Sequence, residues 1–180
     1  MRILLTVAYD GTAYHGWQAQ AHEQKTIEGA LNTSLSRLTG EEITVIGASR
    51  TDAGVHALGN LCVFDTSCSI PPDKFVPALN SVLPDDIRIT GSRIVDGDFH
   101  PRRIDMRKTY CYRLVHSDIC SPMDRLYRHH IYGPLDTDAM SEAAGAFVGE
   151  YDFAAFCAAG SQAETTVRTV YDASVRVTGE

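Results

Sequence analysis

Residues 42–65 read Glu42-Ile43-Thr44-Val45-Ile46, then Gly47-Ala48-Ser49-Arg50-Thr51-Asp52-Ala53-Gly54-Val55-His56-Ala57, and, three residues later, Leu61-Cys62-Val63-Phe64-Asp65. The first run alternates polar and apolar residues and the last is apolar, so both are predicted strands. The loop between them is longer than a strand connection needs, and its small residues let a ligand approach the backbone. Two interpretations stay open from spacing alone: a displayed functional site, or a hairpin loop in which Asp52 caps the backbone and pairs with Arg50.

Patterns on either side of this stretch predict an order of strand, helix, strand, strand, helix, strand. The additional elements are a strand at 2–9, a helix capped by Thr26 and stopped by Gly40, a helix opened by Pro71-Pro72-Asp73, and a strand at 86–95. This order is the split βαβ, ferredoxin-like pattern, an antiparallel sheet with helices on one face. The other face of such a sheet is open to a ligand, and in RNA-recognition modules it carries stacking aromatic residues.

The same kind of pattern begins again after residue 98. It predicts strands at 108–116, 128–132 and 169–178, with a helix capped by Asp136 or Thr137 between them. We therefore predict an α+β protein of two ferredoxin-like (RRM-like) units with antiparallel sheets. Residues 1–98 form the first unit, which carries the loop, and residues 99–180 form an incomplete second unit. Because a long final strand would be an unprotected edge, we expect a fragment or a domain completed by another chain.

The composition is that of a globular protein, with 180 residues, 44% hydrophobic and 22% charged. No apolar run has membrane-spanning length and no secretory signal is visible, so we expect a cytoplasmic protein. Five cysteines without CxxC spacing indicate free thiols.

The formal net charge is −7, but the segment 102–113 holds five basic residues and only one acidic residue, Asp105. The distribution of charge therefore favours a nucleic-acid partner that the total charge does not suggest.

The sequence does not favour a hydrolytic triad or a metal site. A hydrolytic triad of Ser49, Asp52 and His56 lacks a nucleophile elbow, and the adjacent pair His129-His130 would point to opposite faces of a strand, which makes a poor metal site. The remaining features are the Arg and Asp of the loop and a Tyr-x-Tyr strand within the basic cluster, a combination that suits phosphate charge and base stacking. Trp17, the only tryptophan, is either packed on the core or a platform for a base.

With these residues in view, the chain closely resembles the tRNA pseudouridine synthase A family over essentially all 180 residues. The most specific match is the run Arg50-Thr51-Asp52-Ala53-Gly54-Val55-His56. Further matches are Ala8-Tyr9-Asp10-Gly11-Thr12, Tyr14-x-Gly16-Trp17-Gln18-x-Gln20, Thr26-Ile27-Glu28-Gly29-Ala30-Leu31, Asn80-x-x-Leu83-Pro84-x-Asp86-Ile87, Phe99-His100-x-Arg102, Lys108-x-Tyr110-x-Tyr112 and Gly149-Glu150-x-Asp152-Phe153.

The resemblance implies a cofactor-independent isomerase, without metal, that converts uridine to pseudouridine at positions 38–40 of the tRNA anticodon stem-loop. It implies a homodimer with a basic cleft across both subunits. Asp52 matches the catalytic aspartate, Tyr110 the tyrosine that stacks on the target base, and Arg50 the arginine that helps extrude it. Arg102, Lys108 and Trp17 are expected to contact RNA. Asp52 is expected to attack C1′ or the ring, or to act as a base on a glycal route.

The resemblance also implies a segment that is not matched here. Family members continue past the strand at residues 170–177 with another strand and a Phe-Leu-Tyr-x-Met-Val-Arg-like segment, whose Arg pairs with the catalytic aspartate. No stretch of residues 1–180 matches this segment. A second hypothesis for the function is therefore a non-catalytic RNA-binding fragment of the same fold.

Overall fold

The computed structural model describes residues 1–20, 25–157 and 165–178. The chain forms two compact units, Met1–Thr109 and Tyr110–Glu180. Residues 99–109 belong to the first of these compact units, and Arg2 donates a hydrogen bond to the Phe99 carbonyl (2.9 Å). The domain boundary at residues 98/99 stays a prediction.

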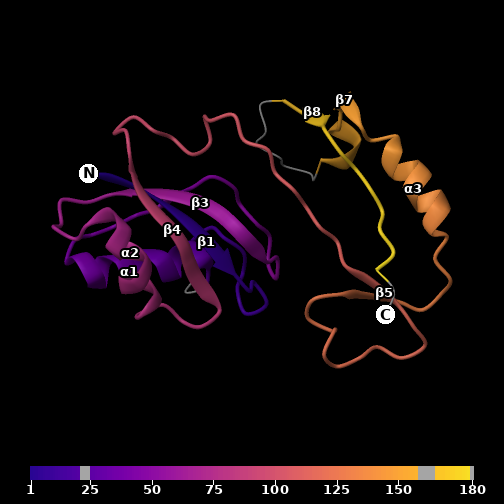
Figure 1. The fold of residues 1–180 in the computed structure, drawn as a ribbon, viewed down its shortest axis with the longest axis horizontal. Helices are drawn as coiled ribbons and strands as arrows, with labels where there is room; N and C mark the ends of the chain where they lie inside the picture. The colour runs from indigo at the N-terminus through magenta and orange to yellow at the C-terminus, as the bar shows by residue number, and fades with distance from the viewer. Residues whose placement is uncertain (21–24, 158–164, 179–180) are drawn as a thin grey trace. The chain divides into compact units, whose positions relative to one another are not determined.

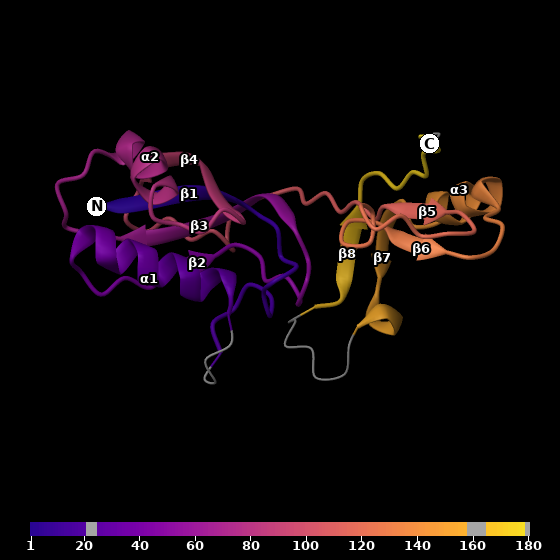
Figure 2. The ribbon, with the colours of Figure 1, turned by 90° about the horizontal axis from the view of Figure 1, so that it is seen from below.

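The N-terminal unit is a four-stranded antiparallel sheet covered by two helices. Its elements are β1 (Arg2–Tyr9), α1 (Ile27–Thr39), β2 (Ile46–Gly47), β3 (Ala57–Asp65), α2 (Phe75–Asn80) after a 3-10 turn at Pro72–Lys74, and β4 (Ile87–Val95). The strands lie in the order β2-β3-β1-β4, and every pair is antiparallel. Figures 1 and 2 show α1 and α2 on the same side of the sheet, α1 beside β2 and β3 and α2 beside β4. The predicted α+β class is confirmed.

The hydrophobic core lies between the sheet and these helices. The alternate residues Ile3, Leu5 and Val7 of the central strand β1 are fully buried, and Leu31 and Leu35 of α1 pack in the same cluster. The alternation of β1 and the helical spacing of α1 meet in this layer because each element has one apolar face to cover. The core therefore fixes β1, whose end leads into the first loop of the site.

The predicted ends of α1 are confirmed. The Thr26 hydroxyl accepts a hydrogen bond from the Gly29 amide, and Gly40 adopts a left-handed conformation with φ of 73°. These caps satisfy main-chain groups that have no partner within the helix. Local sequence is sufficient to define this helix.

The strand predicted at 42–46 is much shorter in the structure, where β2 covers only Ile46–Gly47. The inward and outward alternation is present, since Ile43 and Val45 are buried. Their amides, however, donate to side chains of α1: the Ile43 amide to Ser36 Oγ (3.0 Å) and the Val45 amide to Asn32 Oδ1 (2.9 Å). The prediction was wrong because helix side chains take the donors that a neighbouring strand would use.

The C-terminal unit consists of two separate strand pairs and a helix. Its elements are β5 (Leu114–His116), β6 (His129–Ile131), α3 (Thr137–Gly145), β7 (Gly149–Asp152), a 3-10 turn at Ala154–Phe156, and β8 (Val167–Val170). The pair β7-β8 is antiparallel, whereas β5-β6 is parallel, unlike the predicted antiparallel sheets. Among the described residues of this unit none is buried, in keeping with the predicted incomplete second unit.

The strands predicted at 108–116 and 169–178 are shorter than expected. Within the described residues, β5 begins only at Leu114 and β8 ends at Val170. Alternation makes a segment suitable for a sheet, but a strand forms only where a neighbour supplies the other half of the hydrogen bonds. The helix cap at Asp136 is confirmed, since its carboxylate accepts from the Ala139 amide (2.9 Å).

The bond between Asn32 and the Val45 amide yields a stability prediction. Asn32→Ala leaves a buried main-chain donor without its acceptor, and we expect the free energy of unfolding to fall by about 1–3 kcal/mol. Urea unfolding followed by the fluorescence of Trp17, the only tryptophan, measures the effect in this unit. Asn32→Asp keeps an acceptor oxygen and should lose less. Equal stability of Asn32→Ala and the wild type would contradict the assignment.

Candidate active site

The loop that carries Asp52 is fixed at its start by contacts to β3 and to Arg102. The Ala48 amide donates to the Leu61 carbonyl (2.7 Å), and the Asn60 side-chain amide donates to the Ser49 carbonyl (2.9 Å). Arg102 Nε donates to the Gly47 carbonyl (2.8 Å). These bonds hold the backbone on the approach to Arg50 and Asp52. The loop, residues 48–56, therefore leaves β2 in a defined direction.

The centre of this loop lies on the β1–α1 loop. The Trp17 amide donates to the Thr51 carbonyl (3.0 Å), and the Gly54 amide donates to the Tyr14 carbonyl (3.2 Å). The hydroxyls of Tyr9 and Thr51 form a further hydrogen bond (2.9 Å). The residues on both sides of Asp52 are thus anchored by main-chain and side-chain bonds.

Two glycines permit this close packing of the loops. A Cβ at Gly16, whose φ is 83°, would lie 2.4 Å from the Thr51 carbonyl oxygen. A Cβ at Gly47 would lie 2.5 Å from Trp17 Nε1. Neither contact is sterically possible, so only glycine lets the loops approach as they do.

Trp17 is part of the core rather than of the surface. Its side chain is 1% exposed and lies 6.0 Å from the Tyr9 ring, measured between ring centroids. A side chain buried to this extent offers RNA no surface in this conformation, so it does not act as a platform for a base here. In the described part of the chain the indole N–H has no hydrogen-bond partner.

Asp52 and Arg50 lie at the edge of one open depression of about 310 Å³. The depression is lined by His15, Gln18, Gln20, Arg50, Thr51, Asp52 and Ala53, and its volume is at the lower end of that of ligand sites. No ion pair joins Asp52 to Arg50 among residues 1–20, 25–157 and 165–178. The structure thus does not support the hairpin-loop interpretation in which these two side chains pair.

The sequence assigned no role to His15, Gln18 and Gln20, which line the same depression. All three belong to the β1–α1 loop, which the bond from the Trp17 amide to the Thr51 carbonyl holds against the loop of Asp52. The concentration of polar and aromatic residues in that loop was the feature of the sequence that could have indicated their place in the site.

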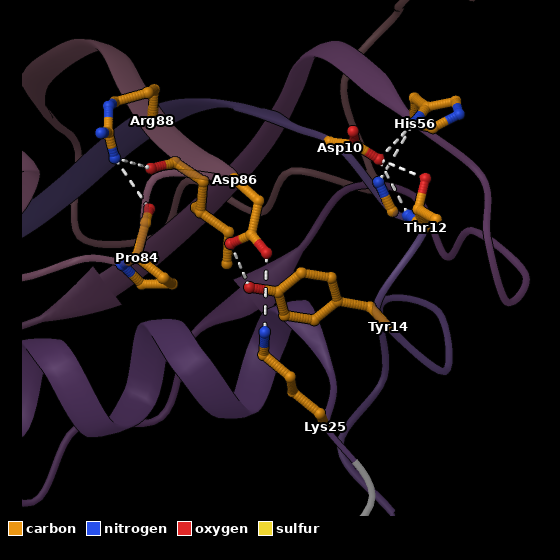
Figure 3. A network of polar contacts seen from close by, with 10 residues as sticks. Asp10, Thr12, Tyr14, Lys25, His56, Pro84, Asp86 and Arg88 are labelled. Atoms are coloured by element: carbon orange, nitrogen blue, oxygen red, sulfur yellow. Dashed lines mark hydrogen bonds and ion pairs between the residues drawn. The ribbon is translucent and has the colours of Figure 1, made fainter. Parts of the chain in front are cut away.

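The far end of the loop at residues 48–56 is tied to the start of the β1–α1 loop, as Figure 3 shows. The Asp10 carboxylate accepts from the amide (3.0 Å) and the hydroxyl (2.6 Å) of Thr12, and His56 Nδ1 lies 3.0 Å from it. The Gly11 amide also donates to His56 Nδ1 (3.1 Å). This nitrogen accepts from the Gly11 amide when it carries no hydrogen and donates to Asp10 when it carries one.

A second polar contact in Figure 3 joins the β1–α1 loop to the start of β4. The Tyr14 hydroxyl donates to Asp86 Oδ1 (2.5 Å), and Lys25 Nζ lies 3.5 Å from Asp86 Oδ2 and 4.3 Å from the centroid of the Tyr14 ring. Burial, and then the Asp86 carboxylate, raise the pKa of Tyr14 well above its ordinary value. Tyr14 therefore remains a hydrogen-bond donor at all physiological pH values.

The other predicted site residues lie outside this depression. Arg102 and Lys108 line a second depression of about 280 Å³ in the same unit. Tyr110 belongs to the C-terminal unit and is 75% exposed. No group of three or more His, Cys, Asp or Glu suited to a metal ion occurs in the described ranges, and no helix there is both long and apolar enough to cross a membrane.

Comparison with known proteins identifies the family of the chain. The profile of the tRNA pseudouridine synthase family matches residues 5–102 and 143–180. The chain belongs to this family. The match includes both loops of the depression, and membership makes the chain an isomerase of the kind that acts on tRNA.

Individual relatives agree with the family match. The tRNA pseudouridine synthase A of Caldicellulosiruptor bescii is 48% identical over 171 residues, which are 95% of this chain and 70% of that protein. That of Acetivibrio thermocellus is 46% identical over 173 residues, with 96% and 70% covered. That of Brevibacillus brevis is 44% identical over 179 residues, with 99% and 73% covered.

The packing at Gly16 gives a prediction for the site. Gly16→Ala places a Cβ against the backbone of Thr51 and forces a non-glycine residue into the left-handed region, so we expect a loss of at least about 1–2 kcal/mol in unfolding free energy. The fluorescence of the neighbouring Trp17 should also shift.

Gly97→Ala is the matched control, because a Cβ at Gly97 meets nothing within 4 Å and its φ is not left-handed. Both variants are measured by urea unfolding. If they were equally stable, the close contact between the two loops would not limit the fold.

Proposed function

We propose that these residues convert uridine to pseudouridine in the tRNA anticodon stem-loop, at positions 38–40, with Asp52 as the nucleophile. The observation that carries the proposal is the exposed Asp52 carboxylate beside Arg50 at one depression, on a loop anchored on both sides. An enzyme that acts on a base needs that base unpaired, in a single strand or turned out of the helix, so that it can enter such a site. Rigid support of the loop holds the carboxylate at a fixed position for the reaction.

The reaction needs no cofactor because uridine and pseudouridine are isomers. The bond from C1′ to N1 breaks, the base turns, and a bond from C1′ to C5 forms; N1 gains a proton and C5 loses one. Asp52 acts as a nucleophile at C1′ or at the ring, or as a base that forms a glycal. The three routes share the requirement for an ionised Asp52 and exclusion of water from the reacting base.

The remaining site residues have supporting roles in this proposal. Arg50, at the edge of the depression, helps to extrude the target base, and Tyr110 stacks on it and assists proton transfer. Arg102 and Lys108 contact the RNA backbone. A basic segment within a chain of net charge −7 limits RNA to one region of the surface.

We propose that the protein works in the cytoplasm as a homodimer with a basic cleft that spans both subunits. Large hydrophobic side chains of the C-terminal unit, including Tyr112 (91% exposed) and Ile119 (83% exposed), are consistent with a surface that a partner covers.

A second candidate function is binding of RNA without catalysis. The observation in its favour is that no ion pair holds the Asp52 carboxylate in the described ranges of the chain, although a cation beside an aspartate favours its ionised form. Incubation with unmodified tRNA, followed by carbodiimide mapping of pseudouridine, separates the two functions. Binding without pseudouridine in the anticodon arm would favour the second.

The nucleophile assignment predicts the effect of Asp52→Asn. Turnover should fall on the order of 10⁴-fold or more, because the amide neither attacks nor takes a proton, while tRNA binding survives. Single-turnover formation of pseudouridine and a filter-binding assay measure the two quantities. Asp73→Asn, at an exposed position, is the control and should retain the wild-type rate. Near-normal turnover of Asp52→Asn would refute the nucleophile.

The role of Tyr110 predicts a different result. Tyr110→Phe keeps the ring that stacks on the base but loses the hydroxyl, so the rate should fall by roughly 10²–10⁴-fold if that hydroxyl transfers a proton, with RNA affinity unchanged. Tyr132→Phe is the matched control, because Tyr132 is also 75% exposed and lies in the same unit. An unchanged rate for Tyr110→Phe would restrict Tyr110 to packing or stacking.

A further inference from the structure

A second depression, of about 280 Å³, lies at the start of the loop at residues 48–56, which we call the catalytic loop because it carries Asp52. It is lined by Ala48, Pro101, Arg102, Ile104, Met106 and Lys108. The first depression begins at Arg50, and two residues of chain span at most about 7 Å. Ala48 of the second depression and Arg50 of the first are therefore close neighbours on one short backbone segment.

The side chains of the second depression are of two chemical kinds. Arg102 and Lys108 supply two positive charges, whereas Ile104 and Met106 supply half-buried apolar side chains. Cations suit a phosphodiester, and an apolar wall suits the face of a base or ribose. The combination fits a nucleotide better than it fits a purely apolar ligand or a free metal cation.

Arg102 also belongs to the support of the catalytic loop. Its Nε donates to the Gly47 carbonyl (2.8 Å), and its backbone amide donates to His100 Nδ1 (3.2 Å). A guanidinium carries five N–H donors in a rigid fork. The Gly47 carbonyl uses the donor on Nε, and the four donors on the terminal nitrogens have the geometry for a phosphate.

We propose that the second depression is a subsite for the nucleotide that flanks the target uridine. Arg102 and Lys108 bind its phosphodiester, and Ile104 and Met106 contact its base or ribose. The inference rests on the proposed function, which places the target uridine in the depression at Asp52. Because Arg102 holds the start of the catalytic loop, the same side chain couples binding of the flanking phosphate to the position of Asp52.

The test is a double-mutant cycle between the protein and the RNA. Wild type and Lys108→Met are bound to anticodon stem-loop RNAs in which one phosphate at a time is replaced by a neutral methylphosphonate. We expect Lys108→Met to lose about tenfold in affinity for the unmodified RNA, as for a charge-assisted contact. The slope of log K against log salt should fall by about 0.7, the value for one phosphate of a single strand.

The decisive result is at one linkage next to the target uridine. There the methylphosphonate should weaken wild-type binding but have no further effect on Lys108→Met, because the two changes remove the same contact. Lys74→Met is the control, since Lys74 lines neither depression, and it should keep the wild-type response. Additive losses at every linkage would overturn the subsite.

The role of Arg102 is tested by measuring kcat and KM separately for two variants. Arg102→Lys keeps the charge but loses the bond from Nε to Gly47, so kcat should fall at least fivefold and KM should rise less than in Lys108→Met, which should chiefly raise KM. Equal effects of both variants on KM alone would refute the coupling.

The double-mutant cycle also separates the subsite from the proposed function. Non-additive losses at one linkage, in a protein that makes no pseudouridine, would support the subsite and refute the proposed catalysis. Absence of RNA binding would refute both.

Discussion

The hydrogen bond from the Trp17 amide to the Thr51 carbonyl, 3.0 Å long, joins the two loops on which the site is built. It places His15, Gln18 and Gln20 opposite Asp52 and creates the first depression. The bond exists because Gly16 has no Cβ and because Trp17 is buried beneath Gly47. Without that close approach, the β1–α1 loop would not form the other wall of the depression at Asp52.

The support of the loop at residues 48–56 is distributed over several elements. Arg102 holds its start, Trp17 and Tyr9 hold its centre, and His56 joins its end to Asp10 and Gly11. Each bond is modest alone, but together they fix the backbone around an exposed carboxylate. A reaction that cuts and remakes the bond to C1′ depends on such fixed geometry.

Patterns that depend on neighbouring residues were predicted well. The caps of α1 at Thr26 and Gly40 and the alternation of β1 follow from short-range stereochemistry, and the strand order follows from the sequence of elements. Patterns that need a distant partner were predicted less well. Residues 42–45 do not form a strand because Asn32 and Ser36 bind two of their amides, and residues 108–113 lie outside β5, although the Arg113 carbonyl accepts from the His129 amide of β6.

The sequence by itself determined the α+β class, the family and the presence of Arg50 and Asp52 in one loop, because these depend on residue order and local periodicity. Only the tertiary structure decided that Trp17 lies in the core, that His15, Gln18 and Gln20 line the same depression as Asp52, and that Arg102 supports the start of the loop that carries Asp52. Each of these depends on contacts between segments far apart in the chain, which form only once β1, α1 and β3 have packed together.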